Sequence, residues 1–352
     1  MKKTLVYLTL AAVLLGGCAK TPKTSKNESA RRYLESWMHV NHPDAQKTPL
    51  GSYILEDIPG TGTPAGSYSQ HPYIRVTYTV SDLSGAVSLT TDEFLNKQLG
   101  TYSEQGYYGP AVWYRGDNAL LAGLEEAVAD MRCGGTRTLV IPGWLMGSES
   151  ATGVSYHYDT AEEYYEKVTG SAPAIYTISL TETIDDIVKW EIDSLAHYVP
   201  AHFPRLAAAD SVKKGFYYCR TDDPSSLEAF AKDTTIYVNY IGRRLDGVVF
   251  DTNIKDTAKF YGLYSASRNY GPAAIKWYGS DGDYTNMEMT VSGSTTASSV
   301  IPGFAFGLDQ MHPHEKGTAI FSSGWGYGTR SASSTIPAYS PLRFDFEIVD
   351  KP

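Results

Sequence analysis

Residues 300–317 read Val-Ile-Pro-Gly-Phe-Ala-Phe-Gly-Leu-Asp-Gln-Met-His-Pro-His-Glu-Lys-Gly. The proline near the start and the apolar side chains up to Met311 predict one short helix, followed by a solvated turn. A related stretch lies 180 residues earlier, where Gly123 and Met131 correspond to Gly303 and Met311. The chain therefore carries this helix twice.

A second constant spacing extends the repeat beyond the helix. Residues 76–78 (Val-Thr-Tyr) resemble residues 238–240 (Val-Asn-Tyr), and Tyr-Gly-Pro-Ala at 108–111 recurs at 270–273, both at an offset of 162. A constant offset across separated motifs indicates two copies of one structural unit. The offset grows by 180 − 162 = 18 before the helix, which predicts a polar surface insertion at 274–299 of the second copy.

Around the repeated helix, the sequence predicts strands separated by Gly and Pro turns, with alternation over 74–80. An amphipathic helix precedes each unit. In the second of these, Ile184, Ile187, Val188, Ile192 and Leu195 are expected on one face, and the helix is expected to end before Pro200. One short helix among antiparallel strands is an α+β architecture. The predicted segments are a signal peptide (1–17), a lipid-anchored tether (18–28), an N-terminal helix (29–49), a first domain (50–182), an interdomain helix and linker (183–213) and a second domain (214–352).

The second unit resembles the FKBP family of peptidyl-prolyl cis-trans isomerases from end to end. The resemblance is carried, in order, by residues 238–242, 245–251, 300–304, 315–317, 325–328, 336–337 and 342–347. It implies two tandem FKBP-like domains, each a strongly twisted antiparallel sheet wrapped around a short helix. In this family the substrate pocket lies between the sheet and the helix of a domain. It implies as catalytic residues Asp251, Tyr327, Tyr240 and Phe250, and as substrate-binding residues Val300, Ile301, Phe304, Ile336 and Phe344.

A site of this kind needs no nucleophile, metal or cofactor. Rotation about a peptide bond costs about 18–20 kcal/mol because it breaks amide resonance. A dry aromatic pocket favours the twisted, less polar amide over the planar one. By the resemblance, the Ile301 N–H and the Tyr327 hydroxyl hold substrate carbonyls, while Asp251 either orients Tyr240 or acts on the carbonyl through its charge.

The first unit resembles the same family but departs from its pattern. Tyr78 is kept and Tyr176 stands for Phe344, whereas Leu89-Thr90 replaces Phe250-Asp251, Leu124 replaces Phe304 and Met146 replaces Tyr327. The polar groups that would orient a peptide are missing. We therefore expect a degenerate, non-catalytic first domain and activity in the second.

Composition and motifs exclude several other classes. The formal charge of −9 without a basic cluster argues against binding to nucleic acid. Cys133 and Cys219 lie far apart in the sequence, so no disulfide framework is expected. The histidines of His312-Pro313-His314 lack partners spaced for a metal site. No HExxH, GxSxG or CxxC motif supports hydrolase or redox chemistry.

The N-terminus predicts export and anchoring. Basic residues, an apolar stretch too short to span a bilayer and Leu15-Gly16-Gly17-Cys18 follow in the order of a signal peptide. The last four residues resemble a bacterial lipobox, which implies lipidation of Cys18. Many bacterial lipoproteins that stay in the inner membrane have an aspartate directly after this cysteine. The resemblance therefore implies that a chain with Ala19 at this position lies at the outer membrane, facing the periplasm. The expected partners are this membrane, through the anchor, and proline-containing segments of exported proteins.

Two other functions stay open from the sequence. One is a non-catalytic chaperone or docking lipoprotein that binds unfolded segments through FKBP-like grooves. The other is a structural envelope protein that uses the fold as a scaffold. Asp251 and Tyr327 favour catalysis by the second unit, and the loss of their counterparts favours simple binding by the first.

Overall fold

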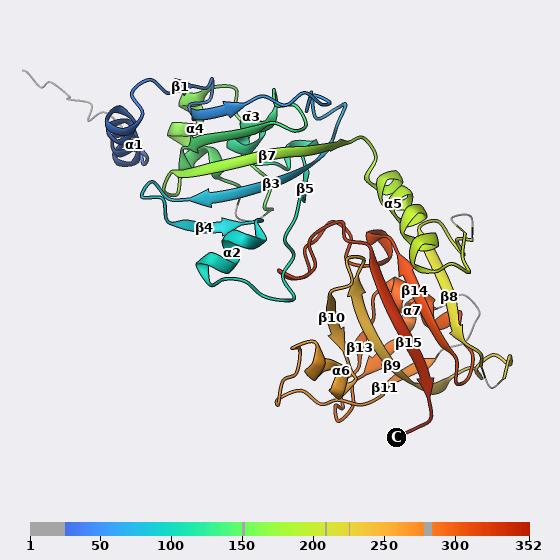
Figure 1. The fold of residues 1–352 in the computed structure, drawn as a ribbon. Coiled ribbons are helices and arrows are strands. Elements are labelled where there is room, and N and C mark those ends of the chain that lie inside the picture. The colour runs from blue at the N-terminus through green and yellow to red at the C-terminus, as the bar shows by residue number, and fades with distance from the viewer. Residues whose placement is uncertain (1–24, 150–151, 208–209, 225, 278–283) are drawn as a thin grey trace, which may run out of the picture.

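The computed structural model describes residues 25–352 except 150–151, 208–209, 225 and 278–283. Two antiparallel sheets, each with a short helix packed against it, are joined by a long helix (Figure 1). This arrangement confirms the predicted α+β fold class. The predicted signal peptide, Cys18 and most of the tether lie outside the described residues.

The first sheet is built from seven strands. Their order is β1 (Gln46–Lys47), β2 (Tyr53–Ile58), β6 (Thr136–Ile141), β7 (Ala174–Ile184), β3 (Tyr73–Ser81) and β4 (Val87–Thr90), with β5 (Ala111–Tyr114) also paired to β3. The second sheet has eight strands. Their order is β13 (Ser298–Ser299), β12 (Glu288–Thr290), β11 (Ala273–Trp277), β9 (Thr234–Arg244), β15 (Leu342–Val349), β14 (Lys316–Phe321) and β8 (Phe216–Asp222), with β10 (Val249–Thr252) on β9.

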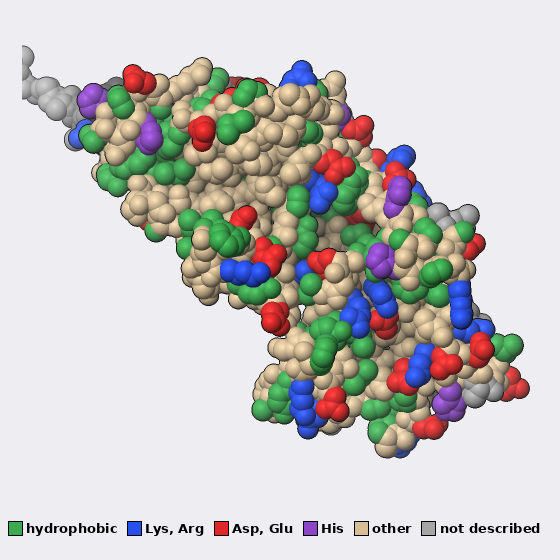
Figure 2. All heavy atoms as spheres, viewed as in Figure 1, with side chains coloured by type: hydrophobic (Ala, Val, Ile, Leu, Met, Phe, Trp, Pro, Cys, Tyr) green, Lys and Arg blue, Asp and Glu red, His purple; other side chains and the backbone are tan. Residues whose placement is uncertain are grey.

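The two sheets share one topology. The path β2-β6-β7-β3 matches β8-β14-β15-β9, and in each unit two further strands pair with the last one. The register agrees as well, since Val80 pairs with Tyr176 where Gly242 pairs with Phe344. The repeat read from the sequence is therefore a repeat of strand pairing. In the space-filling view the two units form separate lobes (Figure 2).

Several helices occupy equivalent places in both units. The α-helices are α1 (Glu28–Asn41), α2 (Glu93–Leu99), α3 (Ala122–Val128), α4 (Ala161–Lys167), α5 (Ile187–His202), α6 (Lys255–Phe260) and α7 (Pro302–Asp309). The 3₁₀-helices are η1 (Gly116–Asn118), η2 (Gly143–Met146), η3 (Tyr284–Asn286) and η4 (Ser323–Trp325). The repeated helix of the sequence corresponds to α3 and α7. None of the helices within the described ranges is long and apolar enough to cross a membrane.

Each unit also has structure of its own. Residues 274–299 of the second unit include η3, β12 and β13, which extend the sheet beyond β11. In the first unit, α4 lies between η2 and β7, a feature that the sequence did not predict. There α4 holds the N-terminal helix in place, because the Asn27 side-chain amide donates to the backbone oxygens of Tyr165 and Val168 at 2.7 and 2.6 Å. Helix α1 thus packs on its own domain.

Helix α5 connects the units and corrects two sequence predictions. It continues through Pro200 to His202, because a proline in the last turn removes one hydrogen bond without ending the helix. Its buried stripe consists of Ile187, Glu191, Leu195 and Val199, whereas Val188, predicted on this face, is exposed. Leu195 and Val199 pack against the second sheet.

A buried carboxylate fastens α5 to the second unit. The side chain of Glu191 accepts hydrogen bonds from the backbone N–H of Ser323 at 2.5 Å and from its hydroxyl at 2.6 Å. Burial raises the pKa of the Glu191 carboxyl. Ser323 begins η4, directly before the segment that carries Tyr327, so α5 is fixed close to the predicted site.

Candidate active site

A cavity of about 410 Å³ lies between the second sheet and α7. All nine site residues predicted from the sequence line it, and Met289, Ser299, Ala332 and Ser333 complete the wall. They come from several elements: β9 carries Tyr240, β10 carries Phe250 and Asp251, β15 carries Phe344, and α7 carries Phe304. The structure thus brings the predicted residues together, while their individual roles stay predictions.

Aromatic rings form the floor. Phe304 is 4% exposed, and its ring centroid lies 5.4 Å from that of Tyr240 and 5.3 Å from that of Phe344, both in edge-to-face contact. Phe250 makes the same type of contact with Phe344 at 5.6 Å. Gly242 of β9 makes room, because a Cβ there would lie 2.7 Å from the Phe250 ring. The result is an apolar pocket lined by ring edges and faces.

A β-bulge places Phe250 and Asp251 together. Val249 pairs with Arg243 and Asp251 with Gly242, so Phe250 is the extra residue in β10. Neighbouring residues of a regular strand point to opposite faces, whereas a bulge redirects one of them. Both side chains therefore line the same cavity.

A carboxylate, a phenol and a guanidinium meet at this cavity. The Tyr240 hydroxyl donates to Asp251 Oδ2 at 2.8 Å, and Arg268 Nη1 donates to Asp251 Oδ1 at 2.6 Å. Arg268 Nη2 lies 3.4 Å from the Tyr240 hydroxyl oxygen. Both oxygens of Asp251 thus have partners within the protein. Of the two roles that the sequence left open, this favours the orientation of Tyr240.

Sequence reasoning missed Arg268. It lies two residues before the repeated Tyr-Gly-Pro-Ala motif, and the first copy has Gly106 at the same place. The surrounding loops are otherwise alike: the Ser265 N–H donates to the Tyr270 hydroxyl oxygen at 2.9 Å, and the Ser103 N–H bonds that of Tyr108 at 2.7 Å. The available signal was the difference between the two copies, which have an arginine and a glycine at equivalent positions.

Two donors on residues that line the cavity have no protein partner within the described part of the chain. Among the described residues, no hydrogen bond uses the amide N–H of Ile301 or the hydroxyl of Tyr327. Burial, followed by the charge of Asp251, raises the pKa of both Tyr240 and Tyr327. Both phenols therefore stay protonated at neutral pH, and Tyr327 can donate to a bound carbonyl.

The described residues of the first unit form no equivalent polar set, but two predicted correspondences were wrong by one residue. The bulge of β4 falls at Ser88, and Leu89 pairs with Val80 as Asp251 pairs with Gly242. Ser88-Leu89, and not Leu89-Thr90, therefore corresponds to Phe250-Asp251. Counted from the ends of β6 and β14, Gly147 rather than Met146 takes the place of Tyr327. A one-residue shift reverses the face of each side chain, so pattern alone could not place the bulge.

The first unit instead contributes to a different cleft, of about 450 Å³. Tyr78, Leu89 and Thr90 line one side, and residues of the second unit around Ser333 line the other. Leu124, Tyr176 and Met146 lie away from it, in or against the core of the first unit. Among the described residues, no group of three or more His, Cys, Asp or Glu side chains is placed to hold a metal ion.

Comparison with known proteins finds one family. Residues 279–349 match the model of the FKBP-type peptidyl-prolyl cis-trans isomerases. The second unit therefore carries an FKBP-type domain. A search of curated proteins finds no match.

Similar solved structures include the three FKBP domains of wheat FKBP73 (15% identity, TM-score 0.28, 85% of this chain and 94% of that one). Others are FkpA from Escherichia coli (22%, 0.30, 47% and 62%) and a peptidyl-prolyl isomerase from Pseudomonas syringae (19%, 0.27, 47% and 97%). At these TM-scores the likeness adds nothing to what the strand order itself establishes.

Proposed function

We propose that this chain is a prolyl cis-trans isomerase that assists the folding of exported proteins, with its active site in the cavity of the second unit. The observation that carries the proposal is the combination of an aromatic pocket with the Asp251–Tyr240–Arg268 group and the unpartnered donors Ile301 N–H and Tyr327 hydroxyl. The matching family model supports it.

The geometry suits rotation about an X-Pro bond. The apolar rings of Phe304 and Phe344 receive the proline and exclude water, which lowers the cost of the twisted, less polar amide. Donors at Ile301 and Tyr327 hold the flanking carbonyls, so one side of the bond is fixed while the other turns. Asp251 and Arg268 hold the Tyr240 hydroxyl in place at the wall of the pocket. The barrier falls through positioning and desolvation, and no bond to the substrate forms.

The intact chain should accelerate cis-trans exchange of an X-Pro peptide, measured by NMR exchange spectroscopy. Tyr327→Phe should lower the rate because it removes the free donor. Tyr68→Phe, at an exposed tyrosine of the first unit, is the matched control and should leave the rate unchanged. A chain that binds the peptide without accelerating exchange would contradict the proposal in favour of a chaperone.

For the first unit we propose binding without catalysis. Leu89, Phe94, Leu99 and Tyr102 are all exposed within a span of fourteen residues. Exposed apolar side chains gathered in this way are typical of an interaction surface. The register places Leu89 where the second unit has Asp251, so the carboxylate of the proposed catalytic group has no counterpart there.

We further propose that the protein acts in the cell envelope, tethered to the outer membrane through lipidated Cys18. The lipobox-like Leu15-Gly16-Gly17-Cys18 supports this location. Cys18→Ser should release the protein from the membrane fraction or leave an uncleaved precursor, as seen by fractionation and immunoblotting. Ser25→Ala, further along the tether, is the control. Full membrane retention of Cys18→Ser without acylation of the wild type would exclude the anchor.

A further inference from the structure

One wall of the proposed active site is a loop without regular secondary structure, residues 331–337, here called the pocket loop. Ala332, Ser333 and Ile336 line the cavity. Within the loop, the Ala332 N–H donates to the Ile336 carbonyl at 3.0 Å and the Ile336 N–H to the Ser333 carbonyl at 3.3 Å. Two remaining carbonyls, those of Ser334 and Thr335, accept hydrogen bonds from outside the loop.

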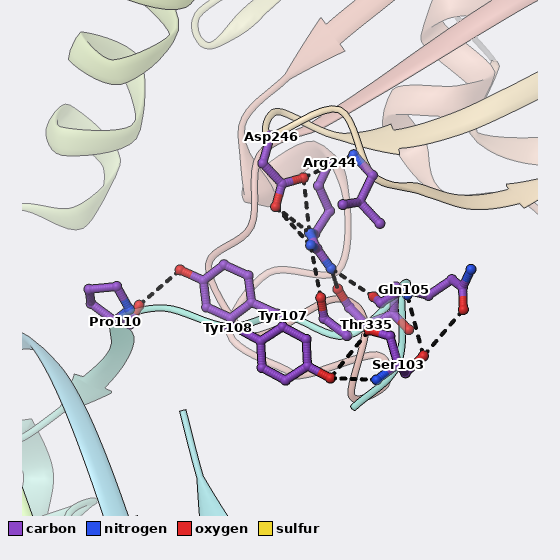
Figure 3. A network of polar contacts seen from close by, with 10 residues as sticks. Ser103, Gln105, Tyr107, Tyr108, Pro110, Arg244, Asp246 and Thr335 are labelled. Atoms are coloured by element: carbon purple, nitrogen blue, oxygen red, sulfur yellow. Dashed lines mark hydrogen bonds and ion pairs between the residues drawn. The ribbon is translucent and has the colours of Figure 1, made fainter. Parts of the chain in front are cut away.

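The donor to Thr335 is Arg244, at the end of β9 (Figure 3). Its side chain is 6% exposed, and Nη1 donates to the Thr335 carbonyl at 2.6 Å. Asp246 holds the other edge of the guanidinium, with Oδ2 2.7 Å from Nη2 and 3.0 Å from Nε. Contact through two nitrogens of the planar guanidinium fixes its orientation, whereas the single ammonium group of a lysine would remain free to rotate.

The same guanidinium binds the first unit. Arg244 Nη1 donates to the Gln105 carbonyl at 2.9 Å and Nη2 to the Gly106 carbonyl at 3.1 Å. Both carbonyls belong to residues 103–110, here called the docking loop. The backbone N–H of Tyr107 then donates to the Ser334 carbonyl at 3.3 Å, and the Tyr107 ring lies 5.3 Å from the guanidinium. Figure 3 shows the docking loop and the pocket loop meeting at Arg244.

The docking loop makes different contacts from the equivalent loop of the second unit. In the second unit, the equivalent loop carries Arg268, which reaches Asp251 beside the pocket. In the first unit, Gly106 takes this position and offers its carbonyl to Arg244 instead. A Cβ on Gly106 would lie 2.5 Å from the Tyr108 hydroxyl, so a larger residue there would require the Tyr108 side chain to shift.

A second contact holds the chain just beyond the pocket loop. Tyr339 is 9% exposed and adopts a left-handed backbone with φ of 57°. Its ring centroid lies 5.4 Å from that of Tyr73 of the first unit, in edge-to-face contact. It belongs to an apolar cluster with Ile184 and Ile187 at the start of the connection between the units. The pocket wall is thus attached to the first unit at two points.

From these contacts we infer that Arg244 is a positioning residue for the isomerase site and that, through it, the first unit holds the pocket loop in its binding conformation. The inference rests on the proposed function. Arg244 does not line the cavity; it acts through the carbonyl of Thr335, next to Ile336. A loop held before the substrate arrives costs less to order on binding, so the first unit should improve substrate binding rather than the rotation step.

The test uses the intact chain with Arg244→Met. Because the loop acts on binding, we expect KM for an X-Pro peptide to rise roughly ten-fold while kcat changes by less than about two-fold. Arg137→Met is the matched control: this arginine of the first unit is also 6% exposed, and its partners Asp57, Asp130 and the Ala127 carbonyl belong to neither the pocket loop nor the docking loop. Its loss should leave both constants unchanged.

Amide hydrogen exchange gives a readout that needs no catalysis. Arg244→Met should speed exchange at Ala332 and Ile336, and Arg137→Met should not. Asp246→Asn, a milder change that weakens the hold on Arg244, should act in the same direction and serves if Arg244→Met fails to fold. The inference would be overturned if the Arg244 and Asp246 variants kept the wild-type KM and the wild-type rate of amide hydrogen exchange, or if Arg137→Met had equal effects. A wild-type chain without isomerase activity would refute the proposed function alone, and amide hydrogen exchange would still decide the role of Arg244.

Discussion

Asp251→Ala in the intact chain should lower kcat/KM for cis-trans exchange by roughly ten- to hundred-fold, because catalysis of this kind depends on positioning. The change removes the acceptor of the Tyr240 hydroxyl and leaves Arg268 without its carboxylate. Exchange spectroscopy on an X-Pro peptide measures the effect. The stability cost should be below about 1 kcal/mol, because the Asp251 and Arg268 side chains are each about a third exposed.

Two companion variants separate the possible causes. Asp251→Asn keeps an acceptor for Tyr240 but removes the charge, so a smaller loss than with alanine would assign the role to orientation. Asp44→Ala, which removes an exposed carboxylate of the first unit outside its cleft, is the control. Undiminished exchange in Asp251→Ala, or an equal loss in Asp44→Ala, would contradict the assignment of activity to the second unit.

Glu315→Ala should lower the free energy of unfolding of the second unit by about 3–5 kcal/mol, because it leaves buried donors without their charge partner. The Glu315 side chain is fully buried and accepts hydrogen bonds from the Tyr218 hydroxyl and from the backbone and ring nitrogens of His312 at 3.1 and 2.9 Å. Arg220 Nε lies 3.1 Å from its Oε1. Urea unfolding followed by amide exchange in β14 would report the loss.

Glu347→Ala provides the comparison. Glu347 faces Lys316 at 3.1 Å across β14 and β15, but both side chains are substantially exposed. An exposed pair contributes little, so its loss should cost less than about 1 kcal/mol. If the two variants were equally stable, the buried network around Glu315 would not support the turn after α7.

His312 shows how far a motif can be interpreted from sequence. The histidines of residues 312–314 were considered as metal ligands and set aside for want of partners. In the structure His312 Nδ1 contacts Glu315, and His314 Nε2 lies 2.9 Å from Asp350 Oδ1. Both have carboxylate partners: Glu315 lies three residues beyond His312 in the chain, whereas Asp350 is far from His314 in the sequence.

The sequence by itself determined the repeat and the α+β class, whereas the nine residues around the cavity of the second unit were indicated by its resemblance to the FKBP family. It did so because strand alternation, Gly and Pro turns and short helices are local properties, and the same local pattern written twice pairs its strands twice in the same way. Only the tertiary structure decided the one-residue bulges at Phe250 and Ser88. It alone also paired Arg268 with Asp251 and placed Arg244 between the units. An arginine side chain is long and has several donors, so its partners depend on register and docking, and no periodicity along the chain announces them.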